Sequence, residues 1–576
     1  MAQDSHEQLC QQASRNFVER LAWSTASRDQ AGIAKGLADG QEITEIYGLG
    51  EATLFDEFLC FLDKIGLAAH FPALDPLRTQ RASNVRFHPT LLIYLMRVTA
   101  GLRFFGHIDP VLLHCPSLMR LVGFNAREVR EGTTARGLHR KPSAPQDSEG
   151  KAEPTDPSLD RVRGPYCPES IAEEISQITP EALERFFNQA IRILAAQGFY
   201  PKKVHALLDA TDIESTQRCE GCGKVTKEKA PDVRARKGRV RKLQVTVFGF
   251  KAWVVWDPNS RLPLAIRFRT IEVPDIEMAQ EVVAQAMENL GDHAQIASLA
   301  IDRGFLDGPF LWWLHDRQHI TFYIPAKTNL TVYPDALSLA STQTPVVRSR
   351  LRWQGHGKNR TQVTDRWELV GLTGLTSAGF YGELGSGSHE NRKDFVPNPL
   401  NAVVVLDDPY KQNNPDTDTL VLLTNGPVQT RSAALSAYDG YDARSEIENG
   451  LHREAKQAWF IERPAQNTLG GFRSHVYLTF LVMGLTTAFR AWLEAEDKSV
   501  AGLPRRAQPM TGIRKFREMV RQESANCLIV FEANRYAIFE AYEIAILLGR
   551  RVRMPRGFPE TITQEDLLRK HGVLRE

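Results

Sequence analysis

The sequence predicts an α/β protein of several domains, and three observations carry this prediction. The chain of 576 residues is too long for a single hydrophobic core. In its middle part, short apolar runs suited to buried strands alternate with helix-like segments. Residues 137–168 are rich in Pro, Ser, Gly and charge, as a flexible linker is, and separate this α/β part from a helical N-terminal domain, residues 1–136.

The elements after the linker follow in a clear order. A helix is expected over 180–197 and a first strand over 204–208, directly before Asp209. The runs LQVTVFGFKAWVVW and LPLAIRFRTI, joined by DPNS, predict a hairpin. A helix over 276–290, a strand ending at Asp302, a helix over 309–316 and the strand ITFYIPAK come next. Three antiparallel strands followed by alternating helices and strands describe an RNase H-like core, whose first part is residues 169–326.

The remaining chain divides into three predicted regions. Residues 327–418 contain β-like runs and many Gly, Asn and Ser residues, which indicates a β-rich insertion. Residues 419–495 return to the core through the run TLVLLTN. Their apolar stretch at 477–489 is too short to cross a bilayer, so we expect a buried core helix. Residues 496–576 form a basic C-terminal region, with 14 Lys and Arg against 9 Asp and Glu from residue 501 onward.

Three acids stand out as candidate site residues. Asp209 and Asp302 follow apolar runs, so both are expected at the ends of buried strands. Glu448 lies in the helix-like segment YDARSEIENGLHREAK. On a regular helix one polar face, about a third of the circumference, collects five side chains. These are Tyr441, Arg444, Glu448, His452 and Lys456, bordered by the apolar row Ile447, Leu451 and Ala455.

Two interpretations of this helix remain open. A solvated helix with ordinary ion pairs between neighbouring turns would show the same charges. Alternatively, three carboxylates could bind hard divalent cations, which activate water and stabilise leaving oxygens in phosphodiester chemistry. Oxygen ligands favour Mg²⁺ or Mn²⁺, and we expect two ions held by Asp209, Asp302 and Glu448. Asp212 is the main rival for the first ligand.

The same motifs resemble a known family. LLDATD and AIDRGF are similar to the two aspartate motifs of the DDE transposases of bacterial insertion sequences, and Tyr441, Arg444 and Glu448 match the spacing of a Tyr-x2-Arg-x3-Glu-x6-Lys signature. This signature marks the insertion-sequence-four-like group, which also has an inserted β domain. The resemblance runs from about 204 to 489. The lysine of the signature would fall on Ala455, and the nearest lysine is Lys456.

The resemblance implies a function and a partner. Asp209, Asp302 and Glu448 would be the catalytic acids, with Asp209 beside Asp302 on adjacent strands. Tyr441, Arg444 and Lys456 would contact DNA. The substrate would be double-stranded DNA, as terminal inverted repeats and target, bound by a homodimer. The protein would cleave DNA at transposon ends and transfer the strands to the target.

The net charge of the chain is only +2, but a second segment besides the C-terminal region is strongly basic. Residues 224–242 hold 9 Lys and Arg against 2 Asp and Glu, and we expect this loop to contact DNA phosphates rather than read bases. Five of these nine are taken as the candidate DNA contacts, namely Arg234, Arg236, Lys237, Arg239 and Arg241. Recognition of the ends is expected in residues 1–136. Trp353 and Trp367 could stack on an unpaired base, but packing inside the insertion is the favoured interpretation for both.

Location and metal content are also read from the sequence. Seven scattered cysteines and the absence of a signal-peptide pattern predict reduced thiols in the cytoplasm, at the nucleoid when DNA is bound. Cys219 and Cys222 form one CxxC, which lacks the further ligands that structural zinc needs.

Other functions stay open at this point. A nuclease or resolvase on the same fold would share the acids but not the Tyr-Arg-Glu segment. A domesticated, non-catalytic DNA-binding protein would be expected to have lost an acid, and a scaffolding protein would need none.

Overall fold

The computed structural model describes residues 26–75, 87–131, 165–229, 243–355, 360–377, 398–415, 417–493, 512–552 and 562–574. These residues divide into two compact units. The described residues of 187–457 and 490–509 form the large-sheet unit, and those of 1–186, 458–489 and 510–576 form the terminal unit. The predicted linker 137–168 falls mostly outside the described residues.

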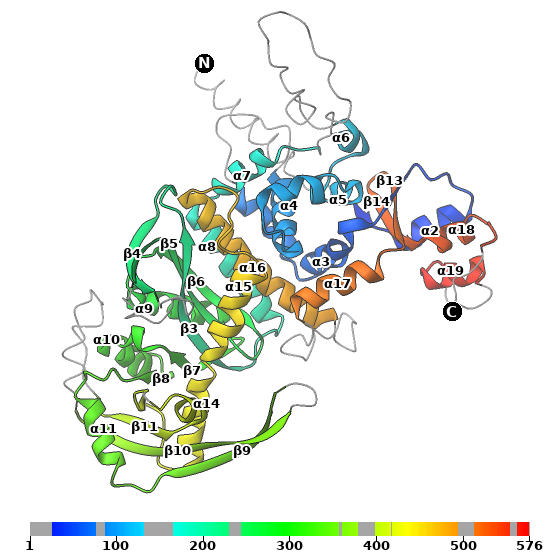
Figure 1. Cartoon of the computed structure of the whole chain (residues 1–576). Helices are drawn as coiled ribbons and strands as arrows, with labels where there is room; N and C mark the ends of the chain where they lie inside the picture. The colour runs from blue at the N-terminus through cyan, green and yellow to red at the C-terminus, as the bar shows by residue number, and fades with distance from the viewer. Residues whose placement is uncertain are drawn as a thin grey trace, which may run out of the picture. The chain divides into compact units, whose positions relative to one another are not determined.

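The large-sheet unit is built on one mixed sheet (Figure 1). Its strands are β3 Lys203–Ser215, β4 Gly223–Lys229, β5 Leu243–Asp257, β6 Leu262–Thr270, β7 Gln295–Ile301, β8 Thr321–Pro325, β9 Val346–Gln354, β10 Thr361–Leu375, β11 Leu400–Asp407 and β12 Leu420–Thr424. Its helices are most of α8 Pro180–Ala196, then η6 Asp275–Met278, α9 Ala279–Leu290, η7 Arg303–Phe305, α10 Gly308–Trp312, η8 Trp313–Arg317, α11 Val332–Ala340, α13 Pro409–Asn413, α14 Arg431–Asp442, η11 Ile447–His452 and α15 Arg453–Gln457.

The centre of this sheet has the RNase H-like order. β6 pairs with β5 and β5 with β3, both antiparallel, while β7 and then β8 run parallel on the other side of β3. The predicted hairpin of β5 and β6, closed by the DPNS turn, is therefore confirmed. The predicted mixed α/β architecture with an RNase H-like core is confirmed as well.

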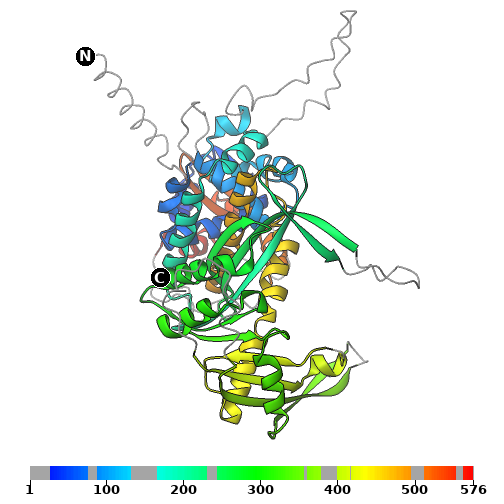
Figure 2. The same ribbon diagram turned by 90° about the vertical axis from the view of Figure 1, so that its left-hand side faces the viewer.

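The predicted β-rich insertion continues the same sheet. β12 pairs with β8, and β11, β10 and β9 follow in antiparallel order to the outer edge. The long hairpin of β9 and β10 is visible at that edge in Figure 1. A second extension is the ribbon of β4 and the first half of β5, which projects beyond the remaining strands in Figure 2.

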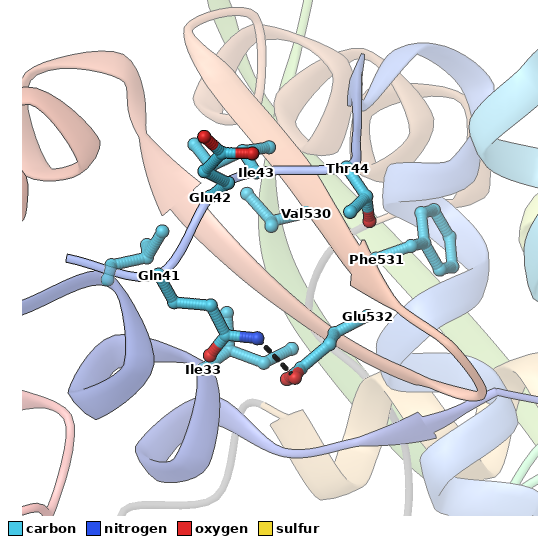
Figure 3. Close-up of a pocket in the computed structure, with 9 residues that line it drawn as sticks. Ile33, Gln41, Glu42, Ile43, Thr44, Val530, Phe531 and Glu532 are labelled. Atoms are coloured by element: carbon cyan, nitrogen blue, oxygen red, sulfur yellow. Dashed lines mark hydrogen bonds between the residues drawn. The ribbon is translucent and has the colours of Figure 1, made fainter. Parts of the chain in front are cut away.

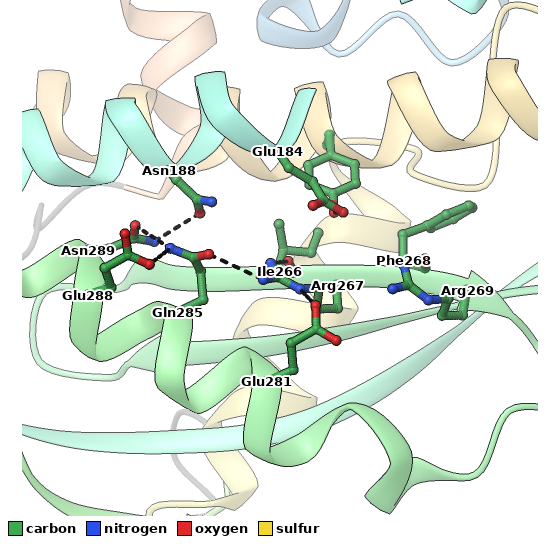
Figure 4. Close-up of polar contacts among 11 residues, drawn as sticks. Glu184, Asn188, Ile266, Arg267, Phe268, Arg269, Glu281, Gln285, Glu288 and Asn289 are labelled. Carbon is green, nitrogen blue, oxygen red and sulfur yellow. Dashed lines mark hydrogen bonds and ion pairs between the residues drawn. The ribbon is translucent and has the colours of Figure 1, made fainter. Parts of the chain in front are cut away.

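Buried polar contacts fasten helix α9 to the sheet (Figure 4). Asn289, which is 1% exposed, donates to Asn188 Oδ1 at 3.0 Å and to the Leu264 carbonyl at 2.8 Å. Arg267 on β6 forms an ion pair with Glu281 and donates to Gln285 Oε1 at 3.2 Å. Because buried amides are costly to leave unpaired, these contacts fix α9 in one register on β6.

The terminal unit combines the two ends of the described chain. Its strands are β1 Ser27–Arg28, β2 Glu45–Gly48, β13 Cys527–Glu532 and β14 Arg535–Glu540, in the order β1-β14-β13-β2. Its helices are α2 Gln30–Ala38, η1 Gly50–Ala52, α3 Thr53–Lys64, η2 Ala68–Leu74, α4 Phe87–Ala100, η3 Phe105–His107, η4 Asp109–Leu113, α5 Pro116–Leu121, α6 Ala126–Glu131, α7 Pro168–Ser176, most of α16 Leu469–Leu493, α17 Ile513–Glu523, α18 Ala541–Leu547 and α19 Gln564–Lys570. The region predicted as a separate C-terminal segment thus shares a sheet and a core with the N-terminal one.

A cavity in this unit lies between α2 and β13 (Figure 3). Ile33, Val530 and Phe531 line it, and Gln41 bonds to Glu532 at its side. Its volume of about 20 Å³ suits a single water molecule, so it offers no room for a substrate.

Helix α16 corrects the length expected for the apolar stretch at 477–489. It runs from Leu469 to Leu493 and is long and apolar enough to cross a membrane, yet 89% of its apolar window is buried inside the protein. Among the described residues it is the one straight helix with this property, while α4 and the segment Phe105–Leu113 would meet the same criterion only as a bent pair.

Candidate active site

The register of two parallel strands brings Asp209 and Asp302 together. Leu208 on β3 is paired with Ile301, the last residue of β7. The next residues along the chain are Asp209, still within β3, and Asp302, directly after β7, so the two aspartates lie at neighbouring positions near the centre of the sheet. The position of Asp302 after a strand agrees with the prediction. Asp209 differs, because β3 continues to Ser215 and the aspartate lies inside the strand.

The segment carrying Glu448 is not the regular helix expected. Helix α14 ends at Asp442, residues 443 and 444 form a turn, and η11 from Ile447 to His452 is a π-helix before α15. The apolar row nevertheless packs as predicted, since Ile447, Leu451 and Ala455 are buried. A π turn contains one residue more than an α turn, so every later side chain is set back by one position, about 100°.

This extra residue decides where Lys456 points. Because the extra residue rotates the side chains after it by about 100°, Lys456 is turned toward strand β3. Its Nζ donates to the carbonyl of Asp212 on β3 at 2.7 Å, which places the lysine beside the strand that carries Asp209. Asp212 itself forms an ion pair with Lys227 on β4.

Arg444 lies among the three acids. Its guanidinium forms an ion pair with Glu448 at 2.8 Å between Nη1 and Oε1. Burial alone would lower the pKa of Arg444, but the pKa is raised because surrounding groups favour the charged form. These groups are Tyr441, Asp302, Glu448 and Asp209.

Tyr441 and His452 are two further side chains close to Asp209, Asp302 and Arg444. Burial, and then the charge of Asp302, raise the pKa of the Tyr441 phenol, while Arg444 opposes the shift. His452 Nε2 lies 3.4 Å from Asp209 Oδ2. Sequence spacing places His452 on the polar helix face but assigns it no role. Its position four residues after Glu448 is the one sequence feature that indicates a place in the site.

Two further glutamates of the same segment, Glu446 and Glu454, lie apart from this group. Glu454 is 3.9 Å from Arg261, on the turn between β5 and β6, and Glu446 is exposed. Neither is among the groups that raise the pKa of Arg444.

The donor chemistry of the site fits a hard divalent cation. Within the described residues the Asp302 carboxylate makes no hydrogen bond or ion pair, so its oxygens are available. Glu448 is engaged by Arg444, and no three His, Cys, Asp or Glu side chains in the described parts of the chain are close enough to hold a metal ion together. The two aspartates therefore offer a partial oxygen site, which Glu448 would complete by leaving Arg444.

Other candidate residues are placed as follows. Trp353 is 64% exposed on β9, so the interpretation that it packs inside the insertion is wrong. Trp367 is half-buried, with the Arg348 guanidinium 4.4 Å from its ring. The basic loop residues Arg234, Arg236, Lys237, Arg239 and Arg241 lie outside the described residues.

Strand order places Asp209 and Asp302 at the centre of a domain with an RNase H-like fold. Residues 200–484 match the family model described as the transposase DDE domain, so this part of the chain is similar to that domain. No curated protein matches the chain. Among solved structures, a cryo-EM structure of the piggyBac transposase synaptic complex with hairpin DNA is similar, with a TM-score of 0.39, 10% sequence identity, and coverage of 82% of this chain and 80% of that one.

Proposed function

We propose that this protein is a metal-dependent DNA transposase, which cleaves DNA at the ends of a mobile element and joins the 3′ ends to target DNA. One observation carries the proposal. The register of β3 and β7 sets Asp209 and Asp302 side by side in the centre of a transposase DDE domain. Arg444 and Glu448 lie against them.

The cofactor in this proposal is Mg²⁺ or Mn²⁺, as two ions. Asp209, Asp302 and Glu448 would hold them through carboxylate oxygens. When bound, the ions supply Lewis acidity, which favours deprotonation of an attacking water or 3′-hydroxyl and stabilises the leaving oxygen.

The chain's own residues bind and orient the DNA backbone. Arg444 is charged and half enclosed by acids, so a phosphate that approaches it can form a bidentate pair. The present partner is easily exchanged, because the Glu448 side chain is 53% exposed and exposed ion pairs contribute little. Transfer of Arg444 from Glu448 to a phosphate would free the glutamate to serve as the third ligand. Tyr441 can donate its hydroxyl to the same backbone.

Lys456 is proposed to replace the signature lysine. The π turn sets it on the same side as Glu448, and its ammonium group already lies at β3. A point charge here would contact a phosphate next to the one held by Arg444.

Further DNA contacts are assigned to the basic loop 230–242. Residues 230–242 lie between β4 and β5, two strands that extend from the large sheet. β4 is the next strand in the chain after β3, which carries Asp209. The partner is double-stranded DNA, bound by a homodimer in the bacterial cytoplasm, with the terminal repeats recognised by residues 1–136.

A plasmid carrying the element's own ends tests the proposal. Strand cleavage should require Mg²⁺ or Mn²⁺ and fail in EDTA or in Ca²⁺ alone. Asp209→Asn and Asp302→Asn should abolish cleavage and leave DNA binding within a few-fold of wild type, since binding depends on basic residues. Full activity in chelator would contradict the metal mechanism. Cleavage without joining to target would indicate a nuclease, and an inactive Asp212→Asn beside an active Asp209→Asn would reassign the first ligand.

A further inference from the structure

His452 is a buried histidine directed at the first aspartate. It ends the π turn, and the residue is 7% exposed. Its Nε2 lies 3.4 Å from Oδ2 of Asp209, and the two side chains are 9% and 14% exposed. The contact therefore lies in a nearly solvent-free place on the inner side of the segment that carries Glu448.

The imidazole has no other partner among the described residues. Neither ring nitrogen makes a hydrogen bond, and 3.4 Å is long for one to Asp209. A buried N–H without an acceptor is unfavourable. The nearest ion-pair partner is the Asp209 carboxylate, so a small closure of the segment onto β3 would satisfy the ring and the carboxylate together.

The same segment already has a second contact with this strand. Lys456, four residues after His452, donates to the carbonyl of Asp212. The π turn and α15 thus approach β3 at positions 209 and 212, which fixes His452 over one residue of the strand rather than leaving it free to turn away.

We propose that His452 is a positioning residue for Asp209. A ring N–H donates to Oδ2, holds the carboxylate in one rotamer and leaves Oδ1 for the divalent cation. The inference rests on the proposed function, since it concerns the same metal site. Hydrogen bonds from neighbouring groups to ligating carboxylates commonly change metal affinity by about 10–100-fold when they are removed.

Four variants test this inference. His452→Leu and His452→Met fill the space without a donor, and His452→Gln keeps a donor. His293→Leu is the matched control, because His293 is exposed in the same unit. Mn²⁺ binding to the full-length protein without DNA is measured by electron paramagnetic resonance, and thermal unfolding shows which variants are folded. Cleavage is then titrated with Mn²⁺.

The donor-free variants should bind Mn²⁺ about 10–100-fold more weakly, with cleavage at saturating Mn²⁺ within about threefold of wild type. His452→Gln should recover most of the affinity, and His293→Leu should match wild type. Either donor-free variant suffices if the other is unfolded. Unchanged Mn²⁺ affinity, or equal losses in the Gln and donor-free variants, would overturn the inference. A wild-type protein that binds Mn²⁺ but cuts no DNA would instead contradict the proposed function.

Discussion

The acids on the strands and the acid on the helical segment are held by different means. Asp209 and Asp302 are neighbours because β3 and β7 pair in one register, and a change of register would disrupt the whole sheet. Glu448 lies on a π turn, is 53% exposed and is bound to Arg444. The strand pair is therefore preset, while the third acid can exchange partners. Such a division suits a site that must assemble only around DNA and metal.

The largest effect is expected for Glu448, the acid that can exchange partners. Glu448→Gln keeps size and hydrogen bonding but removes the charge that a cation needs, so cleavage of native ends should fall by about two to three orders of magnitude. The free energy of unfolding should change by less than about 0.5 kcal/mol, because the Glu448 side chain is exposed. Glu446→Gln and Glu454→Gln are the controls and should stay within a few-fold of wild type. Equal sensitivity of all three glutamates would refute the assignment of Glu448.

A smaller effect tests the π turn. Lys456→Ala should reduce cleavage by roughly tenfold and lower the slope of log K against log salt by about 0.9, as for one lost phosphate contact. Deletion of Asn449 removes the extra residue, so an ordinary helical turn would then carry the lysine to the same side, and activity should be largely kept. Lys203→Ala, an exposed lysine at the start of β3, is the control. A deletion as damaging as Lys456→Ala would show that the π turn does not set the lysine.

The smallest effect on activity is expected for Asn289, which holds helix α9 on the sheet that carries Asp209 and Asp302. Asn289→Ala leaves Asn188 and the Leu264 carbonyl without their buried donor, which should cost about 1–3 kcal/mol of unfolding free energy. Cleavage per folded molecule should stay near wild type at low temperature, because the strand register is kept. Glu288→Gln, at an exposed ion pair with Arg192, should alter neither. Chemical denaturation and a cleavage assay on the same samples measure both quantities.

Sequence patterns predicted those elements whose signal is local. The hairpin of β5 and β6 and the strand before Asp302 were identified because continuous apolar runs end at turn residues. The length of β3 was underestimated, since beyond Asp209 only alternate residues such as Thr211 and Ile213 are buried. An alternating pattern over so few residues is a weak signal.

Other features depend on distant parts of the chain. The pairing of Ser27 with Arg535 joins the chain ends in one sheet, and nothing in either local sequence specifies the partner. The π turn was indicated only by the one-residue offset of Lys456 from the signature spacing. The extra residue is accommodated without loss of packing, because Ile447, Leu451 and Ala455 are all buried.

The most direct test locates the metal on the polypeptide. Fe²⁺ in place of Mg²⁺, with ascorbate and peroxide, generates hydroxyl radicals that cut the chain beside the bound ion. In the complex with cleaved ends, we expect cuts near Asp209, Asp302 and Glu448, suppressed by excess Mg²⁺ and absent in the Asp209→Asn, Asp302→Asn double variant. Cuts confined to other segments, or cuts at the two strands without one near Glu448, would contradict the three-acid site.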